Sequence, residues 1–224
     1  MTAARQGSEH AYPTHAMSSS GTQRRHPAIG VSMGHLVAGS RITDATETAY
    51  AHAVVSAGSV PLLVPALPAV PTEDIVERLD GLLLTGGGDV DPHRYGATPS
   101  PQCGHLDHLV PERPSATIHH VEVEEESQLA RIVRSPKFAV NSIHHQAVEQ
   151  AAPELAAVGR AGDGVVEAIE HPSLPVLGVQ WHPENLLRHR KHHALFDWLI
   201  STAGRWSAPY SEPARYSETA SARG

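Results

Sequence analysis

A histidine and a glutamate two residues apart are the strongest chemical signal in the sequence. His182 and Glu184 lie in the segment GVQWHPE, residues 178–184. This segment overlaps the end of the apolar stretch Pro175–Gln180, so both side chains follow that stretch. Side chains two positions apart in an extended segment share one face, so the carboxylate can hold one ring nitrogen and leave the other as a general base. Such a pair is typical of a nucleophile–base–orienter triad. The alternative is a surface histidine beside Pro183, with the glutamate capping the next helix.

A glycine-rich turn is the second signal. LLLTGGGDVDPHRYG, residues 82–96, carries Gly86, Gly87 and Gly88 after an apolar run. Backbone N–H groups in such a turn can approach a phosphate or an oxyanion closely. The pattern is neither G-x-G-x-x-G nor a Walker loop, so it does not predict nucleotide binding. Asp89 and Asp91 either bind a metal or, as we expect, cap the turn.

Histidines and amides supply the remaining candidates. In NSIHHQAV, Asn141, His144 and Gln146 follow a short apolar stretch and form either a binding loop or an ordinary hydrogen-bonded one. Ligand-like spacing also occurs among other histidines, namely His105, His108, His119 and His120. Because they lack partner cysteines and an H-E-x-x-H pattern, the sequence predicts no metal site and no cofactor.

The first half of the chain must position the glycine turn. Short apolar runs predict buried strands, and they alternate with two segments of helical character. The expected strands are Ala28–Met33, Ser59–Val64 and Gly81–Thr85, and the expected helices are Asp44–Gly58 and Thr72–Leu79. Asp44 is expected to cap the first helix with Glu47 as its reciprocal partner. The alternation predicts a parallel sheet covered on both faces.

The second half has a different pattern. Ile118–Glu124 alternates, Phe138–Val140 is short and apolar, and a turn at 161–164 predicts a hairpin of Ala156–Arg160 with Val165–Glu170. Pro175–Gln180 predicts another buried strand. Leu187–Ala203 is an amphipathic helix whose apolar face, with Leu195, Trp198 and Leu199, is expected to join the core.

Composition excludes several classes of protein. The 224 residues carry 17 basic and 24 acidic side chains, so nucleic acid is an improbable partner. The single cysteine, Cys103, permits no internal disulfide, and no apolar run is long enough to cross a membrane. Residues 1–27 lack an apolar signal segment, which predicts a cytoplasmic protein. We expect disordered tails at 1–27 and 205–224 around one domain at 28–204.

Four segments together resemble the class I glutamine amidotransferase superfamily, and within it the γ-glutamyl-γ-aminobutyrate hydrolase family. They are AIGVSM at 28–33, LLLTGGGDVDPHRYG at 82–96, FAVNSIHHQAV at 138–148, and DGVVEAIEH with LPVLGVQWHPE between 163 and 184. The resemblance implies a flavodoxin-like α/β fold, a mostly parallel sheet with helices on both faces. It also implies a Cys-His-Glu triad that cleaves a small γ-glutamyl amide through a thioester.

The resemblance assigns roles to individual residues. His182 corresponds to the base and Glu184 to its orienter, while the turn Gly86–Gly88 corresponds to the donor of one oxyanion N–H. Near the mouth of the substrate site it places three polar side chains, Asn141, His144 and Gln146.

One part of the family pattern is missing. The family carries its nucleophile on a strand–elbow–helix with a pattern like G-I-C-R-G, and nothing between Tyr95 and Phe138 resembles it. The domain is therefore expected to be shortened near 108–110, without the central nucleophile strand and its flanking helices. Cys103, in SPQCGHL, has no strand leading into it and does not fit a nucleophile elbow.

Three hypotheses follow from this departure. The chain is a hydrolase in which Cys103 or a water replaces the nucleophile, a pseudoenzyme that binds a γ-glutamyl ligand or a partner, or a poorly folded deletion product. The sequence favours an inactive or impaired member of the family. Loss of a central strand would expose its neighbours, so a second copy or another chain is expected to cover the shortened sheet.

Overall fold

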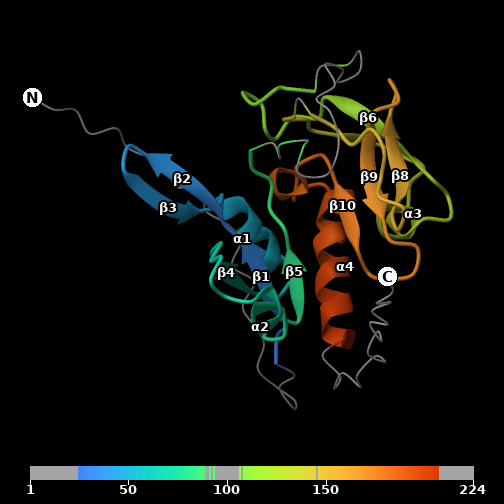
Figure 1. Cartoon of the computed structure of the whole chain (residues 1–224). Helices are drawn as coiled ribbons and strands as arrows, with labels where there is room; N and C mark the ends of the chain where they lie inside the picture. Colours follow the sequence, from blue (N-terminus) through green and yellow to red (C-terminus); the bar gives the residue numbers. More distant parts are fainter. Residues whose placement is uncertain are drawn as a thin grey trace, which may run out of the picture.

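The computed structural model describes residues 25–88, 91, 93, 106, 108–144 and 146–206. These residues form a three-stranded sheet, a five-stranded sheet and a separate two-stranded hairpin. Figure 1 shows the two larger sheets on either side of helix α4 (Arg190–Trp206). The predicted α/β class is confirmed.

The first half forms a parallel sheet in the order β4-β1-β5. Its strands are β1 (Ala28–Ser32), β4 (Val60–Val64) and β5 (Gly81–Leu83), close to the predicted ranges. Helix α1 (Thr48–Ser56) packs Tyr50 and Val54 against Ile29 and Val31, whose side chains are fully buried. Helix α2 (Thr72–Val76) is short and contributes no buried residue.

The second half forms an antiparallel sheet in the order β10-β9-β8-β6-β7. The strands are β6 (His119–Val123), β7 (Lys137–Val140), β8 (Ala156–Ala161), β9 (Val166–Glu170) and β10 (Leu177–Val179), and helix α3 (Gln128–Val133) follows β6. The predicted hairpin is confirmed as β8 and β9. Strand β10 is shorter than expected and only half-buried, because it lies at the edge of the sheet and pairs with β9 alone.

A β-hairpin precedes α1 where the sequence predicted the start of the helix. Strands β2 (Gly34–Ala38) and β3 (Arg41–Ala45) project away from the body (Figure 1). The predicted helix start at Asp44 was wrong, because Asp44 pairs with His35 across the hairpin and their side chains lie 2.5 Å apart. The helix begins only at Thr48, and Glu47 at its N-cap makes no capping hydrogen bond.

Helix α4 joins the two larger sheets. Its Leu195 belongs to the core of the five-stranded sheet, with Trp181 and Leu129. One turn later, Leu199 packs with Ala203 into the core of the three-stranded sheet. The predicted apolar face is thus divided between two cores, and Trp198 is only half-buried. No helix among the described residues has the length and apolar character that a membrane crossing requires.

One face of the three-stranded sheet departs from the expected burial. Strand β4 was predicted to be buried, yet Val60 and Leu62 are 45% and 42% exposed. Leu82 and Leu84, on the same face, are 40% and 73% exposed. Alternate residues of a strand point to opposite faces, and α1 and α4 cover the face that Ile29 and Val31 present. The predicted cover of this sheet by helices on both faces is therefore incomplete, because the face that carries Val60 and Leu62 stays exposed.

The segment between β5 and β6 contains no strand or α-helix within its described residues, apart from an isolated bridge between Leu109 and Ile143. Most of the two predicted tails lies outside the described residues. Helix α4 extends into the second of them, to Trp206, and Arg25 forms an ion pair with Asp80 at 3.0 Å.

Candidate active site

The predicted histidine–glutamate pair forms a hydrogen bond. His182 follows strand β10 and directly precedes the short 3-10 turn η2 (Pro183–Asn185), which contains Glu184. The distance from His182 Nδ1 to Glu184 Oε1 is 2.6 Å. The Glu184 side chain is 1% exposed and that of His182 is 23% exposed. The carboxylate thus holds Nδ1 as the donor, which leaves Nε2 as the nitrogen able to accept a proton.

The surroundings of His182 favour its charged form. Burial lowers the pKa of the imidazole, but the hydrogen bond and charge of Glu184, with the charge of Glu47, outweigh burial and raise the pKa above its ordinary value. A general base works best when its pKa is near the operating pH. His182 therefore has the electrostatics of a general base, because the Glu184 carboxylate stabilises its protonated form.

Tyr50 is a member of this site that the sequence did not reveal. Its hydroxyl lies 3.4 Å from His182 Nδ1 and accepts a hydrogen bond of 3.0 Å from the Gly86 N–H. Burial, followed by the charge of Glu184, raises the pKa of the phenol, which stays protonated. The spacing of Tyr50 within α1 carried no signal, because its partners come from two other segments.

The glycine turn approaches the histidine closely. A Cβ added at Gly86 would lie 2.9 Å from the Tyr50 hydroxyl and 3.1 Å from His182 Cε1, so only glycine fits without movement. The Gly86 N–H is already bonded to Tyr50. Gly87 and Gly88 are exposed with open space around them. Within the turn predicted to donate one oxyanion N–H, the structure brings Gly86 to His182 and uses the Gly86 N–H in a bond to Tyr50.

Asn141 fixes the backbone of His182. Its Oδ1 accepts the His182 N–H at 3.0 Å, and its Nδ2 donates to the His182 carbonyl at 3.0 Å and to the Pro114 carbonyl. The amide is fully buried, so all three bonds are sheltered from water. Asn141 therefore positions the candidate base, whereas the resemblance placed it at the substrate mouth.

The other residues of the NSIHHQ segment lie apart from the pair. His144 is buried and its Nδ1 donates to the Gln146 carbonyl at 3.0 Å. The imidazole of His144 packs 4.8 Å from that of His108, measured between ring centroids, and not against His182. Gln146 is exposed. Their proposed roles at a substrate mouth stay predictions.

Cys103 and Asp89 lie outside the described residues. Asp91 accepts a hydrogen bond of 3.0 Å from the His93 N–H, as expected of a capped turn.

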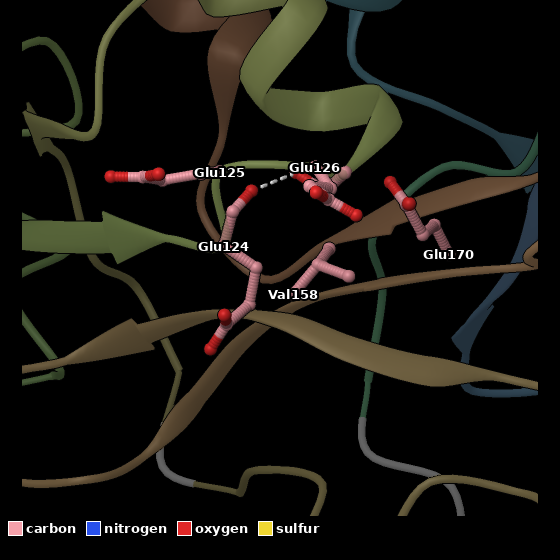
Figure 2. A pocket seen from close by; sticks show the side chains of 6 residues that line it. Glu124, Glu125, Glu126, Val158 and Glu170 are labelled. Atoms are coloured by element: carbon pink, nitrogen blue, oxygen red, sulfur yellow. Dashed lines mark hydrogen bonds between the residues drawn. The ribbon is translucent and has the colours of Figure 1, made fainter.

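A separate hollow opens beside the turn that leads into α3 (Figure 2). It is lined by Glu124, Glu125, Glu126, Ser127, Val158 and Glu170, and it contains none of the predicted catalytic residues. The Glu170 carboxylate accepts the backbone N–H groups of Gln128 and Leu129 at the start of α3. Helix capping thus accounts for Glu170 in this hollow.

The order of these segments along the chain matches a known family. The family model described as peptidase C26 matches residues 27–113 and 102–184. The chain belongs to the peptidase C26 family. The second matched stretch ends at Glu184, so it includes both members of the histidine–glutamate pair.

Curated relatives resemble much of the chain. The γ-glutamyl-γ-aminobutyrate hydrolase PuuD of Escherichia coli is 29% identical over 238 residues, with 79% of this chain and 93% of the relative covered. A glutamine amidotransferase-like protein, YvdE of Lactococcus lactis, is 30% identical over 173 residues, covering 53% of this chain and 72% of the relative.

A solved structure shares the C26 chain's fold. It is the crystal structure of a Thermoplasma acidophilum protein described as one subunit of GMP synthase, with a TM-score of 0.58 and 13% identity. The match covers 82% of this chain and 97% of that one. At this identity the likeness establishes the fold alone.

Proposed function

We propose that this C26 chain retains the ligand-binding site and the general base of a γ-glutamyl amide hydrolase but has lost most or all of the cleavage activity. The observation that carries the proposal is the 2.6 Å bond between His182 Nδ1 and Glu184 Oε1, built next to the glycine turn. A base without a nucleophile at hand can hold a γ-glutamyl ligand but forms no thioester.

The alignment with PuuD supports a shortened domain. The aligned stretch is 238 positions long, whereas 79% of this chain is about 177 residues, so about 60 positions face gaps in this chain. A strand–helix–strand unit needs roughly 30 residues or more. A gap of this size leaves room for the loss of the elbow strand together with its helices.

The edges of the two sheets agree with such a loss. Among the described residues, strand β5 pairs with β1 alone and β10 with β9 alone, so each of them forms one edge of its sheet. A strand between them would join the two sheets into one. The described residues between β5 and β6 supply no such strand.

Glutamate release from γ-glutamyl-γ-aminobutyrate and from glutamine tests the proposal. We expect the full chain to release no more glutamate than His182→Ala. Release that His182→Ala abolishes would overturn the proposal, and Cys103→Ala would then show whether that cysteine is the nucleophile. Calorimetry with both compounds measures the retained binding, which we expect His182→Ala to weaken. Absence of binding to the parent chain would also contradict the proposal.

We further propose that another chain covers the exposed sheet face of Val60, Leu62, Leu82 and Leu84. Contiguous apolar side chains at an exposed face are typical of interaction surfaces. The simplest occupant is a second copy, which we expect to see as a dimer in sedimentation velocity. Leu82→Lys should shift the dimer to monomer. A monomer at all concentrations would exclude the second copy.

A further inference from the structure

Three histidines surround one buried carboxylate of the five-stranded sheet, apart from the His182–Glu184 pair. Glu167 lies in β9 and His119 is the first residue of β6. His108 precedes β6 in the chain, and His144 follows β7. All four side chains are at most 6% exposed, and that of Glu167 is completely buried. The sequence predicted no metal site, because these ligands come from four separate segments.

The imidazoles converge on a single oxygen. From Glu167 Oε1 the distance is 3.0 Å to His119 Nε2, 3.4 Å to His108 Nδ1 and 3.5 Å to His144 Nε2. One ligand atom each from His108, His119 and Glu167 lies within 4.8 Å of the others. A tetrahedral zinc site with bonds near 2.0–2.1 Å places neighbouring ligand atoms about 3.3 Å apart. The three imidazole nitrogens lie at nearly this spacing from Glu167 Oε1, whereas ligand atoms within the cluster are up to 4.8 Å apart, so a bound ion would draw the imidazoles closer together.

Outer hydrogen bonds leave two of the imidazoles with lone pairs facing the carboxylate. His144 Nδ1 lies 3.0 Å from the Gln146 carbonyl, which can only accept, so Nδ1 carries the proton and Nε2 carries the lone pair. His108 Nε2 donates to the carboxylate of Asp163 at 3.1 Å, so in the neutral imidazole Nδ1 carries the lone pair. Ser142 approaches this Nδ1 at 3.3 Å, but its hydroxyl donates to the His108 carbonyl at 2.9 Å.

Lone pairs that face a carboxylate oxygen repel it unless the ring takes up a second proton or a cation lies between the two atoms. Three buried polar atoms of this cluster also lack a hydrogen-bond partner among the described residues, namely His119 Nδ1, His144 Nε2 and Glu167 Oε2. Each such atom costs free energy when it is shielded from water. A metal ion would satisfy His144 Nε2 directly, and Asp163 and the Gln146 carbonyl would then act as the outer partners that orient ligating histidines.

We propose that His108, His119, His144 and Glu167 bind one divalent transition-metal ion of the zinc type. Three imidazole nitrogens and one carboxylate oxygen suit Zn²⁺ rather than Mg²⁺ or Ca²⁺, which prefer oxygen ligands. Four protein ligands close the coordination shell, so the site is structural. The bound ion would connect β6, β9 and the loop after β7 to His108. His108 lies near 108–110, where the domain is expected to be shortened.

Zinc titration of the full chain, freed of metal by chelation, tests this proposal. We expect one Zn²⁺ per chain with a raised melting temperature, and a tetrahedral absorption spectrum when Co²⁺ replaces it. His119→Gln and Glu167→Gln should each weaken Zn²⁺ binding at least tenfold, and Asp163→Asn should weaken it about tenfold through His108. His120→Gln is the matched control, because His120 neighbours His119 on β6 but is exposed.

Equal Zn²⁺ affinity of His119→Gln and His120→Gln would overturn the proposal, because the 17 histidines of the chain could then bind metal non-specifically. Circular dichroism of each metal-free variant shows whether it folds. Where a ligand variant does not fold, the Co²⁺ spectra of the parent chain and of His120→Gln decide. A stoichiometric tetrahedral spectrum in both proteins supports the site. Absence of that spectrum overturns it and leaves a histidine–glutamate hydrogen-bond network.

Discussion

Replacing Asn141 by alanine is expected to lower the free energy of unfolding by roughly 2–4 kcal/mol, because it leaves buried backbone groups without partners. The amide bonds both the N–H and the carbonyl of His182, and it also holds the Pro114 carbonyl. Water cannot replace these bonds without entering a fully buried position. Urea unfolding followed by far-ultraviolet circular dichroism measures the change.

Asn185→Ala is the matched control for this prediction. Asn185 is half-buried, and its amide contacts Glu184 Oε1 only weakly, at 3.4 Å. We expect Asn185→Ala to cost less than about 1 kcal/mol. If Asn141→Ala costs no more than this control, the Asn141 amide does not support His182 in the way its hydrogen bonds indicate.

The candidate site was predictable only where its members are close in sequence. His182 and Glu184 are two residues apart, so local geometry suggested their hydrogen bond, and the resemblance favoured it over a surface histidine beside a capping glutamate. Asn141 and Tyr50 reach His182 from 41 and 132 residues away, and no periodicity in the sequence encodes that distance. The histidines around Glu167 stayed unassigned for the same reason, since tertiary structure alone brings them together.

The fold shows the same division between local and tertiary signals. Continuous apolar runs predicted β1, β4 and β5 well, because parallel strands need such runs. The hairpin of β2 and β3 was missed, although Gly39 adopts a φ of +62° at its turn. The residue pair Gly39-Ser40 between alternating segments is a hairpin signal that a search for helix caps overlooked. Exposure of β4 depends on what packs beside it, which the strand's own residues do not specify.

A second large effect is expected in the cores. Leu129→Ala should lower the free energy of unfolding by about 3 kcal/mol, and Ile29→Ala by a similar amount, because both side chains are fully buried and each leaves a cavity. Leu129 belongs to the core of the five-stranded sheet and Ile29 to that of the three-stranded sheet. Leu36→Ala, in the exposed hairpin, is the control and should change stability little.

The shape of the unfolding curve distinguishes a folded family member from a deletion product. Because α4 supplies Leu195 to one core and Ala203 to the other, loss of either core removes packing from the same helix. We therefore expect one cooperative transition, which Leu129→Ala and Ile29→Ala both shift. Tryptophan fluorescence, to which Trp181 in the core of the five-stranded sheet contributes, should follow the same curve as far-ultraviolet circular dichroism. Two transitions, each moved by only one variant, would mean that the two sheets fold independently and that α4 does not unite them.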